Sequence, residues 1–149
     1  MIMGATRREW QEMGAWDATV FGNDDAADLS GEIADLRSTN QIVGALRDAL
    51  TTVTTGDDYI DAGDASVALA AAALVAAWHQ PSVLPDSAYT PTPWPPDGAP
   101  APTELKPLAL QVIDRLLIET DNELFELWDE AGLWNDFTAD IERYRQILV

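Results

Sequence analysis

The feature that most constrains the fold is the spacing of the apolar side chains, which recur every three to four residues through most of the chain. At about 100° per residue, this spacing places them on one face of a helix. In the first such segment they are Leu29, Ile33 and Leu36. In the next they are Ile42, Leu46, Leu50 and Val53. No convincing stretch alternates apolar and polar residues as a half-buried strand does, so the sequence predicts an all-α protein.

Residues that can cap a helix precede the apolar segments, since their side chains accept hydrogen bonds from free backbone amides. We expect the caps to be Asn23 or Asp24, Thr39 or Asn40, Asp64, Asp121 or Asn122, and Asn135. The sequence therefore predicts a single compact domain of about five to six helices. Their expected ranges are about 24–36, 40–54, 65–79, 103–119, 122–131 and 135–148.

Two of these helices have distinctive compositions. Apolar residues cover most of the circumference of the helix expected over about 103–119, so we expect it to be the central and most buried one. The helix expected over about 65–79 is rich in alanine, which allows other helices to approach closely.

A long proline-rich loop connects these two helices. Residues 80–102 hold eight of the nine prolines, which remove backbone donors and restrict the residues before them. We expect no regular structure there. The segment is either a mobile linker or, as we favour, an ordered strap pinned by Tyr89 and Trp94. A proline-rich ligand for a peptide-binding domain is a further reading, although no basic residue flanks the motif.

The size and the absence of cysteine limit the class of protein. The 149 residues suit one domain, which we place at 13–149, with residues 1–12 as an N-terminal appendage. The chain has no cysteine, which excludes disulfides and thiolate sites and fits a cytoplasmic location. The longest apolar run, 67–78, is shorter than the roughly 18 residues that indicate a membrane span.

The net charge is strongly negative, at −18, and Lys106 is the only lysine. Direct binding to nucleic acid is unfavourable for such a chain, because that affinity comes from basic side chains that neutralise phosphates. A basic protein is the electrostatically natural partner. Solubility, a salt-tolerant host or a G+C-rich genome also account for the composition.

The sequence gives little support to catalysis. His79, the only histidine, follows Trp78 at the end of an apolar helix, where the helix C-terminus favours a protonated ring. We therefore expect it to cap or pack rather than to catalyse. No Gly-x-Ser-x-Gly elbow, P-loop or Gly-x-Gly-x-x-Gly motif is present.

An acidic stretch over 56–64 contains hard oxygen ligands of the kind that calcium or magnesium requires. Its weak candidate ligands are Asp57, Asp58 and Asp61. The stretch lacks the ligand spacing and the terminal glutamate of an EF-hand, so we interpret it as a helix-capping loop. We expect no cofactor and no dedicated metal site.

Carboxylates repeat every three to four residues along two predicted helices and lie roughly 5–6 Å apart, a spacing comparable to that of phosphates along a nucleic-acid strand. In the first helix they are Asp24, Asp28, Glu32 and Asp35. In the fifth they are Glu123, Glu126 and Glu130. Our first hypothesis is an acidic module that docks on a basic toxin, nuclease or DNA-binding protein. Such a module would be an immunity protein, an inhibitor or a DNA mimic.

Two other hypotheses remain open. The paired carboxylates at 24/28 and 123/126 suit a divalent-metal-dependent enzyme, although no Glu-x-x-His motif accompanies them. A structural or assembly subunit is the third class. The sequence does not indicate an oligomeric state.

Three segments resemble an uncharacterised bacterial group, the domain-of-unknown-function family 4259. They are Met13-Gly14-Ala15-Trp16 with Asn23-Asp24-Asp25-Ala26-Ala27-Asp28, the alanine-rich 69–77, and Asn122-Glu123-Leu124-Phe125-Glu126-Leu127-Trp128-Asp129-Glu130. Asp17 and Leu29 depart from the family pattern, which tends to have glycine and an aromatic residue there. The resemblance implies a small bacterial or phage protein of unknown role. From the residues themselves, we expect Trp16 and Phe21 to be core anchors at the start of the domain.

Overall fold

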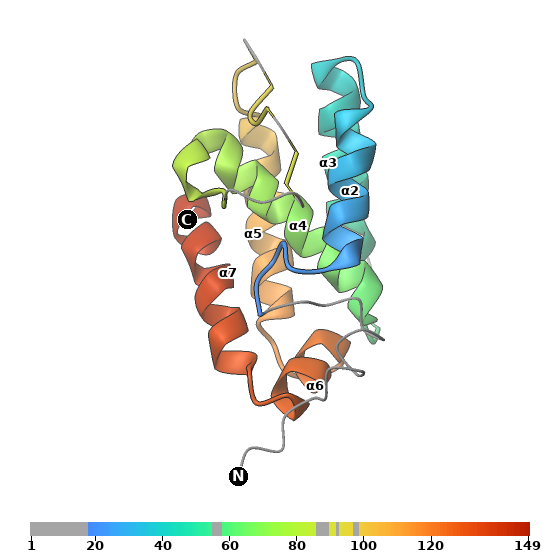
Figure 1. Cartoon of the computed structure of the whole chain (residues 1–149), viewed down its shortest axis with the longest axis vertical. Helices are drawn as coiled ribbons and strands as arrows, with labels where there is room; N and C mark the ends of the chain where they lie inside the picture. Colours follow the sequence, from blue (N-terminus) through green and yellow to red (C-terminus); the bar gives the residue numbers. More distant parts are fainter. Residues whose placement is uncertain (1–17, 55–57, 86–89, 92, 97–98) are drawn as a thin grey trace.

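The computed structural model describes residues 18–54, 58–85, 90–91, 93–96 and 99–149, and these form one compact, mainly helical domain (Figure 1). Its α-helices are α2 (Asp24–Ala34), α3 (Thr39–Thr54), α4 (Ala62–His79), α5 (Lys106–Leu116), α6 (Glu123–Glu130) and α7 (Trp134–Leu148). Two short 3-10 turns, η1 (Pro81–Val83) and η2 (Thr103–Leu105), lie at the ends of the proline-rich connection. The described residues form no strand, so the predicted all-α class is confirmed.

The central helix is α4, in which thirteen of 18 residues are buried. It packs against α2, α3, α5, α6 and α7. The prediction that the helix over about 103–119 would be central was wrong. Helix α5 buries one face and ends at Leu116, and Ile118 beyond it is 52% exposed. Alanine side chains are short in every direction, so a helix rich in them can be surrounded by neighbours on all sides.

By length and composition, α4 is apolar enough to cross a membrane. That is weak evidence for a span, since 72% of the relevant window is buried inside the fold and a core helix passes the same test.

Two predicted helix caps are confirmed. The Asn23 Oδ1 accepts a hydrogen bond from the Ala26 amide at 2.8 Å, while its Nδ2 donates to the Val20 carbonyl at 3.1 Å. The Asn122 Oδ1 accepts from the Leu124 amide at 3.1 Å at the start of α6. These two asparagines fix the starts of α2 and α6.

Four other helices begin differently from prediction. Helix α5 begins at Lys106, because Thr103–Leu105 form the 3-10 turn η2 in place of its expected first turn. Helix α3 is capped by Ser38, whose Oγ accepts from the Gln41 amide, while the Gln41 side chain accepts from the Ser38 amide. This reciprocal arrangement is a capping box, and it replaces Thr39 and Asn40 as caps. Helix α4 starts about one turn early because Asp61, rather than Asp64, caps it.

Helix α7 begins at Trp134, and no side chain caps it, so the cap predicted at Asn135 was wrong. Gly132, at φ 76°, ends the preceding segment as predicted, because glycine adopts this left-handed conformation without a side-chain clash.

Residues 90–91, 93–96 and 99–102, the described residues in the second half of the proline-rich connection, are called the proline strap here. The Trp94 indole donates to the Leu74 carbonyl at 3.1 Å and packs edge-on against Trp78, with 5.2 Å between ring centroids. The Trp78 indole donates to the Ala99 carbonyl at 3.3 Å. The predicted contact of Trp94 is confirmed, whereas Tyr89 lies outside the described residues.

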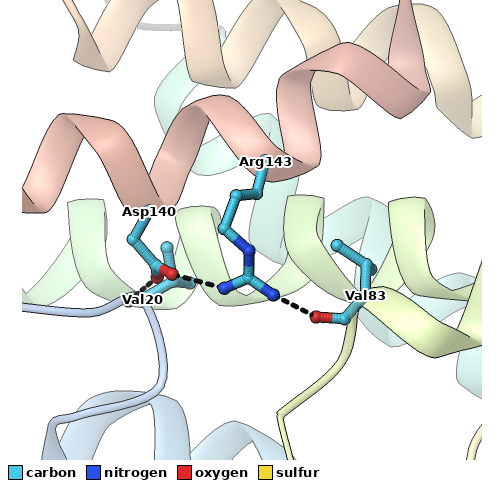
Figure 2. Close-up of polar contacts among 4 residues, drawn as sticks. All are labelled: Val20, Val83, Asp140 and Arg143. Carbon is cyan, nitrogen blue, oxygen red and sulfur yellow. Dashed lines mark hydrogen bonds and ion pairs between the residues drawn. The ribbon is translucent and has the colours of Figure 1, made fainter.

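A polar clasp joins three segments that are distant in sequence (Figure 2). The Asp140 carboxylate accepts from the Val20 amide at 2.9 Å and pairs with the Arg143 guanidinium at 2.7 Å. Arg143 also donates to the Val83 carbonyl at 2.7 Å. Helix α7 thereby holds both the entry to α2 and the turn η1.

An aromatic contact lies next to this clasp. Phe21 is buried, as predicted, with its ring edge-on to Tyr144 at 6.3 Å. Trp16, the other expected anchor, and the predicted boundary after residue 12 lie outside the described residues.

Candidate docking surface

Helix α2 presents an acidic face to solvent. Asp24, Asp28, Glu32 and Asp35 are all exposed, as the helical spacing predicts. The opposite face buries Ala26, Leu29 and Ile33 in the core. The buried face fixes the rotation of the helix, so the exposed carboxylates are held in position by core packing.

The first turns of α2 and α4 lie close enough for their carboxylates to repel one another. Burial raises the pKa of Asp25, and the charges of Asp28, Asp24, Asp61 and Asp64 raise it further. We call these five aspartates, from two segments distant in sequence, the acidic end. The neighbouring negative charges favour the protonated form of the Asp25 carboxyl, because each of them destabilises its carboxylate.

Two members of the acidic end also interact directly. Asp61 accepts a hydrogen bond from the Asp64 amide at 2.8 Å and caps α4. Burial, followed by the charge of Asp61 and a hydrogen bond to its side chain, raises the pKa of Asp64. The capping geometry therefore holds two carboxylates together at the start of one helix.

Helix α6 is joined to this region by backbone pairing. The Ile60 amide donates to the Asp121 carbonyl, and the Glu123 amide donates to the Ile60 carbonyl, both at 3.0 Å. The Glu123 carboxylate accepts from the Ala62 amide at 2.7 Å. Glu123 was predicted to bind a partner, but this hydrogen bond commits one of its oxygens to holding α4.

The other acidic residues of α6 face solvent. Glu126 and Glu130 are exposed, as expected for a docking surface. Tyr59, itself 50% exposed, lies beside Glu126. Desolvation, followed by a hydrogen bond to Glu126 and the charge of that carboxylate, raises the pKa of Tyr59 to about 12.

Basic side chains do not neutralise this region within the described part of the chain. The ion pairs among the described residues join Arg47 to Glu104, Arg143 to Asp140, and Arg145 to Asp114 and Glu142. Arg115 donates instead to the carbonyls of Thr120 and Asp121. None of these pairs includes a carboxylate of the acidic end or the exposed carboxylates of α6.

Two of the three weak metal candidates, Asp58 and Asp61, lie among the described residues. Asp57 lies outside the described residues, and Asp61 is used as a cap. Asp58 is exposed. Among the residues that the structure describes, no three histidine, aspartate or glutamate side chains converge as metal ligands.

His79 lies at the opposite end of α4 from the acidic end. Burial lowers its pKa, and the charge of Lys106 lowers it further. This direction is opposite to the one expected from the helix C-terminus alone. His79 Nε2 is buried without a hydrogen-bond partner.

Sequence reasoning missed Asp25, Asp61, Asp64 and Tyr59 as members of the surface, and Asp61 was considered only as a weak metal ligand. Asp25 falls outside the three-to-four-residue stripe, and Asp64 was assigned to capping. The available signal was that the first turns of α2 and α4 both carry aspartates. Their proximity is a property of the packed fold.

Comparison with known proteins gives one match. No curated protein and no solved structure matches the chain. The family described as "Domain of unknown function (DUF4259)" matches residues 14–140, which include α2, α4 and α6 entirely. Because the match covers well over half of the chain, the protein belongs to this family of unknown function.

Proposed function

We propose that this protein is an acidic binding module that docks on a basic protein partner through the acidic end and the adjoining faces of α2 and α6. The observation that carries the proposal is that the charges of Asp24, Asp28, Asp61 and Asp64, from two helices, act together on the partly buried Asp25. These carboxylates repel one another, and no described arginine or lysine pairs with them. Arginine or lysine side chains of a partner would relieve that repulsion on binding.

The exposed faces of α2 and α6 beside the acidic end also carry carboxylates. Along α2 the exposed carboxylates continue through Glu32 and Asp35, and on α6 they are Glu126 and Glu130. Neighbouring members of each row lie roughly 5–6 Å apart, which suits a groove that normally binds nucleic-acid phosphates. The favoured partner is therefore a nuclease, toxin or DNA-binding protein, and the favoured role is immunity or inhibition.

Residues within this surface have different roles in the proposal. Glu123 supports the surface by bonding to the Ala62 amide. Asp24 and Asp28 are the most direct probes of docking, since they are exposed and have no hydrogen bond or ion pair within the described structure. Neutralising them changes the charge of the acidic end without removing a described contact.

The test is affinity capture from host lysate with the double variant Asp24→Asn/Asp28→Asn. The matched control is Asp48→Asn/Asp136→Asn, which removes two exposed charges from α3 and α7. We expect the wild type and the control to retain the same basic protein, and the acidic-end variant to lose it, as read by mass spectrometry. Equal capture by both double variants would refute the proposed surface.

A further inference from the structure

A basic side chain lies at each end of the proline-rich connection. Helix α4 ends at His79, and α5 begins at Lys106. The two lie close enough that the charge of Lys106 acts on the imidazole. The chain thus leaves α4 and enters α5 beside the same pair of groups.

The proline strap is fastened to α4 immediately before this point. Trp94 donates to the Leu74 carbonyl, and Trp78, the neighbour of His79, donates to the Ala99 carbonyl. The two indole rings contact each other edge-on. Two hydrogen bonds and one ring contact therefore hold the strap against the last turns of α4.

His79 is poorly placed to carry a charge in this arrangement. In the neutral ring one nitrogen is a donor and the other an acceptor, whereas in the protonated ring both are donors. Nε2 is buried without a partner, so protonation would leave a charged N–H away from water. It would also place a second positive charge beside Lys106.

We propose that protonation of His79 loosens the proline strap from α4, so that His79 acts as a proton-operated latch on the strap. While the ring is neutral, the end of α4, the start of α5 and the strap pack together. When the ring is protonated, it requires water at Nε2 and separation from Lys106, and both are gained when the packing around His79 loosens. The Trp78–Trp94 contact opens with it.

Among the described charged groups on the neighbouring elements, Lys106 is the one whose charge acts on the imidazole. Helix α5 contributes Lys106, and η2 contributes Glu104, which pairs with Arg47. Helix α7 contributes Arg143, whose guanidinium holds Asp140 and the Val83 carbonyl of η1. Residues 81–83 of η1 have no titratable side chain. Asp86 and Asp97 lie outside the described residues.

The latch is independent of the proposed docking surface. His79 is the last residue of the 18-residue helix whose first turn belongs to the acidic end. At about 1.5 Å per residue, the two ends of α4 are roughly 25 Å apart. Failure of one proposal therefore leaves the other intact.

The test is an NMR titration of the folded full-length protein, which has a single histidine. We expect His79 to titrate below its ordinary pKa of 6.5 and closer to it in Lys106→Gln. The indole N–H signals of Trp78 and Trp94 should shift with the same midpoint as the imidazole. In the neutral variant His79→Gln, both indole signals should stay constant over that pH range.

Three results would overturn the latch. They are a His79 pKa at or above 6.5, indole signals that do not change as His79 titrates, and an indole shift in His79→Gln as large as that in the wild type. Lys106→Gln keeps the test decisive if His79→Gln fails to fold, because it leaves the histidine in place. An unchanged His79 midpoint in that variant would also contradict the proposal.

Discussion

The carboxylate of Glu123 accepts a hydrogen bond from the backbone amide of Ala62 at 2.7 Å, so a side chain at the start of α6 holds the start of α4. Asp61 fastens the same turn from within α4 by accepting from the Asp64 amide. Two carboxylates thus use the free amides of one helix N-terminus, where negative charge is favourable. This junction fixes the position of α6 beside the acidic end.

Replacing Glu123 by alanine should destabilise the fold. The Ala62 amide would lose its acceptor, and we expect a loss of about 1 kcal/mol in the free energy of unfolding. Glu123→Gln keeps an acceptor oxygen and should lose less. Urea denaturation of both variants measures the difference. Equal losses would show that charge rather than the hydrogen bond carries the effect.

Asn122→Ala should be more damaging, because Asn122 is completely buried and satisfies groups on both sides of a turn. Its Nδ2 donates to the carbonyls of Leu116 and Ile118, and its Oδ1 accepts from the Leu124 amide. Losing the cap and leaving buried carbonyls unpaired should cost about 2–3 kcal/mol.

A chemical denaturation curve measures the Asn122→Ala loss, and Asn122→Asp serves as the control. That variant keeps the acceptor for α6 and removes the donor to α5. At neutral pH it should be at least as unstable as Asn122→Ala, because it buries a carboxylate whose oxygen faces these carbonyls, and it should recover stability as falling pH protonates the carboxyl. A loss below about 0.5 kcal/mol for Asn122→Ala would contradict this account.

The acidic end should respond to pH in a specific direction. Burial and neighbouring carboxylates raise the pKa of Asp25 above 3.8. Between pH 3.8 and the raised pKa, the folded state therefore binds more protons than the unfolded state. The Asp25 carboxylate therefore lowers the free energy of unfolding at neutral pH. This destabilisation is relieved as pH falls through the raised pKa of Asp25.

Asp25→Asn should therefore be more stable than the wild type at neutral pH. The advantage should shrink as pH falls through the raised pKa of Asp25 and vanish below 3.8, where the carboxyl is protonated in both states. Thermal denaturation across this range measures it. A constant advantage, or a wild type more stable at pH 7, would be inconsistent with repulsion.

The packing around α4 predicts intolerance to larger side chains. Ala72 is fully buried, so Ala72→Leu forces neighbouring helices apart and should cost about 1–3 kcal/mol. Ala34→Leu, at an exposed position in α2, makes the same change without overpacking and should be nearly neutral. Urea midpoints compare the two, and similar values would mean that α4 is not tightly surrounded.

Periodicity and capping chemistry were sufficient to predict the helical class and to place two caps at Asn23 or Asp24 and at Asp121 or Asn122, and the asparagine is the cap in each pair. Both asparagines act within a few residues of themselves, so the signal is local. The box formed by Ser38 and Gln41 was equally local, and the sequence contained it, although it was overlooked.

The remaining features depend on which helices become neighbours. Helix α4 is central because its side chains are small enough for other helices to surround it. Apolar periodicity instead favours helices rich in leucine and isoleucine, and therefore pointed to α5. The hydrogen bond of Glu123 spans 61 residues, and the repulsion on Asp25 comes partly from a second helix. Neither the hydrogen bond of Glu123 nor the repulsion on Asp25 can be predicted from the spacing of charges within one helix.

The most direct test of the docking proposal is calorimetric titration of the captured basic partner at about 50 mM and about 500 mM salt. We predict that wild-type affinity falls at least roughly tenfold between the two conditions. Asp24→Asn/Asp28→Asn should bind more weakly than the wild type, and Asp48→Asn/Asp136→Asn should bind equally well. Tight binding that is unchanged by salt and by Asp24→Asn/Asp28→Asn would contradict the proposal.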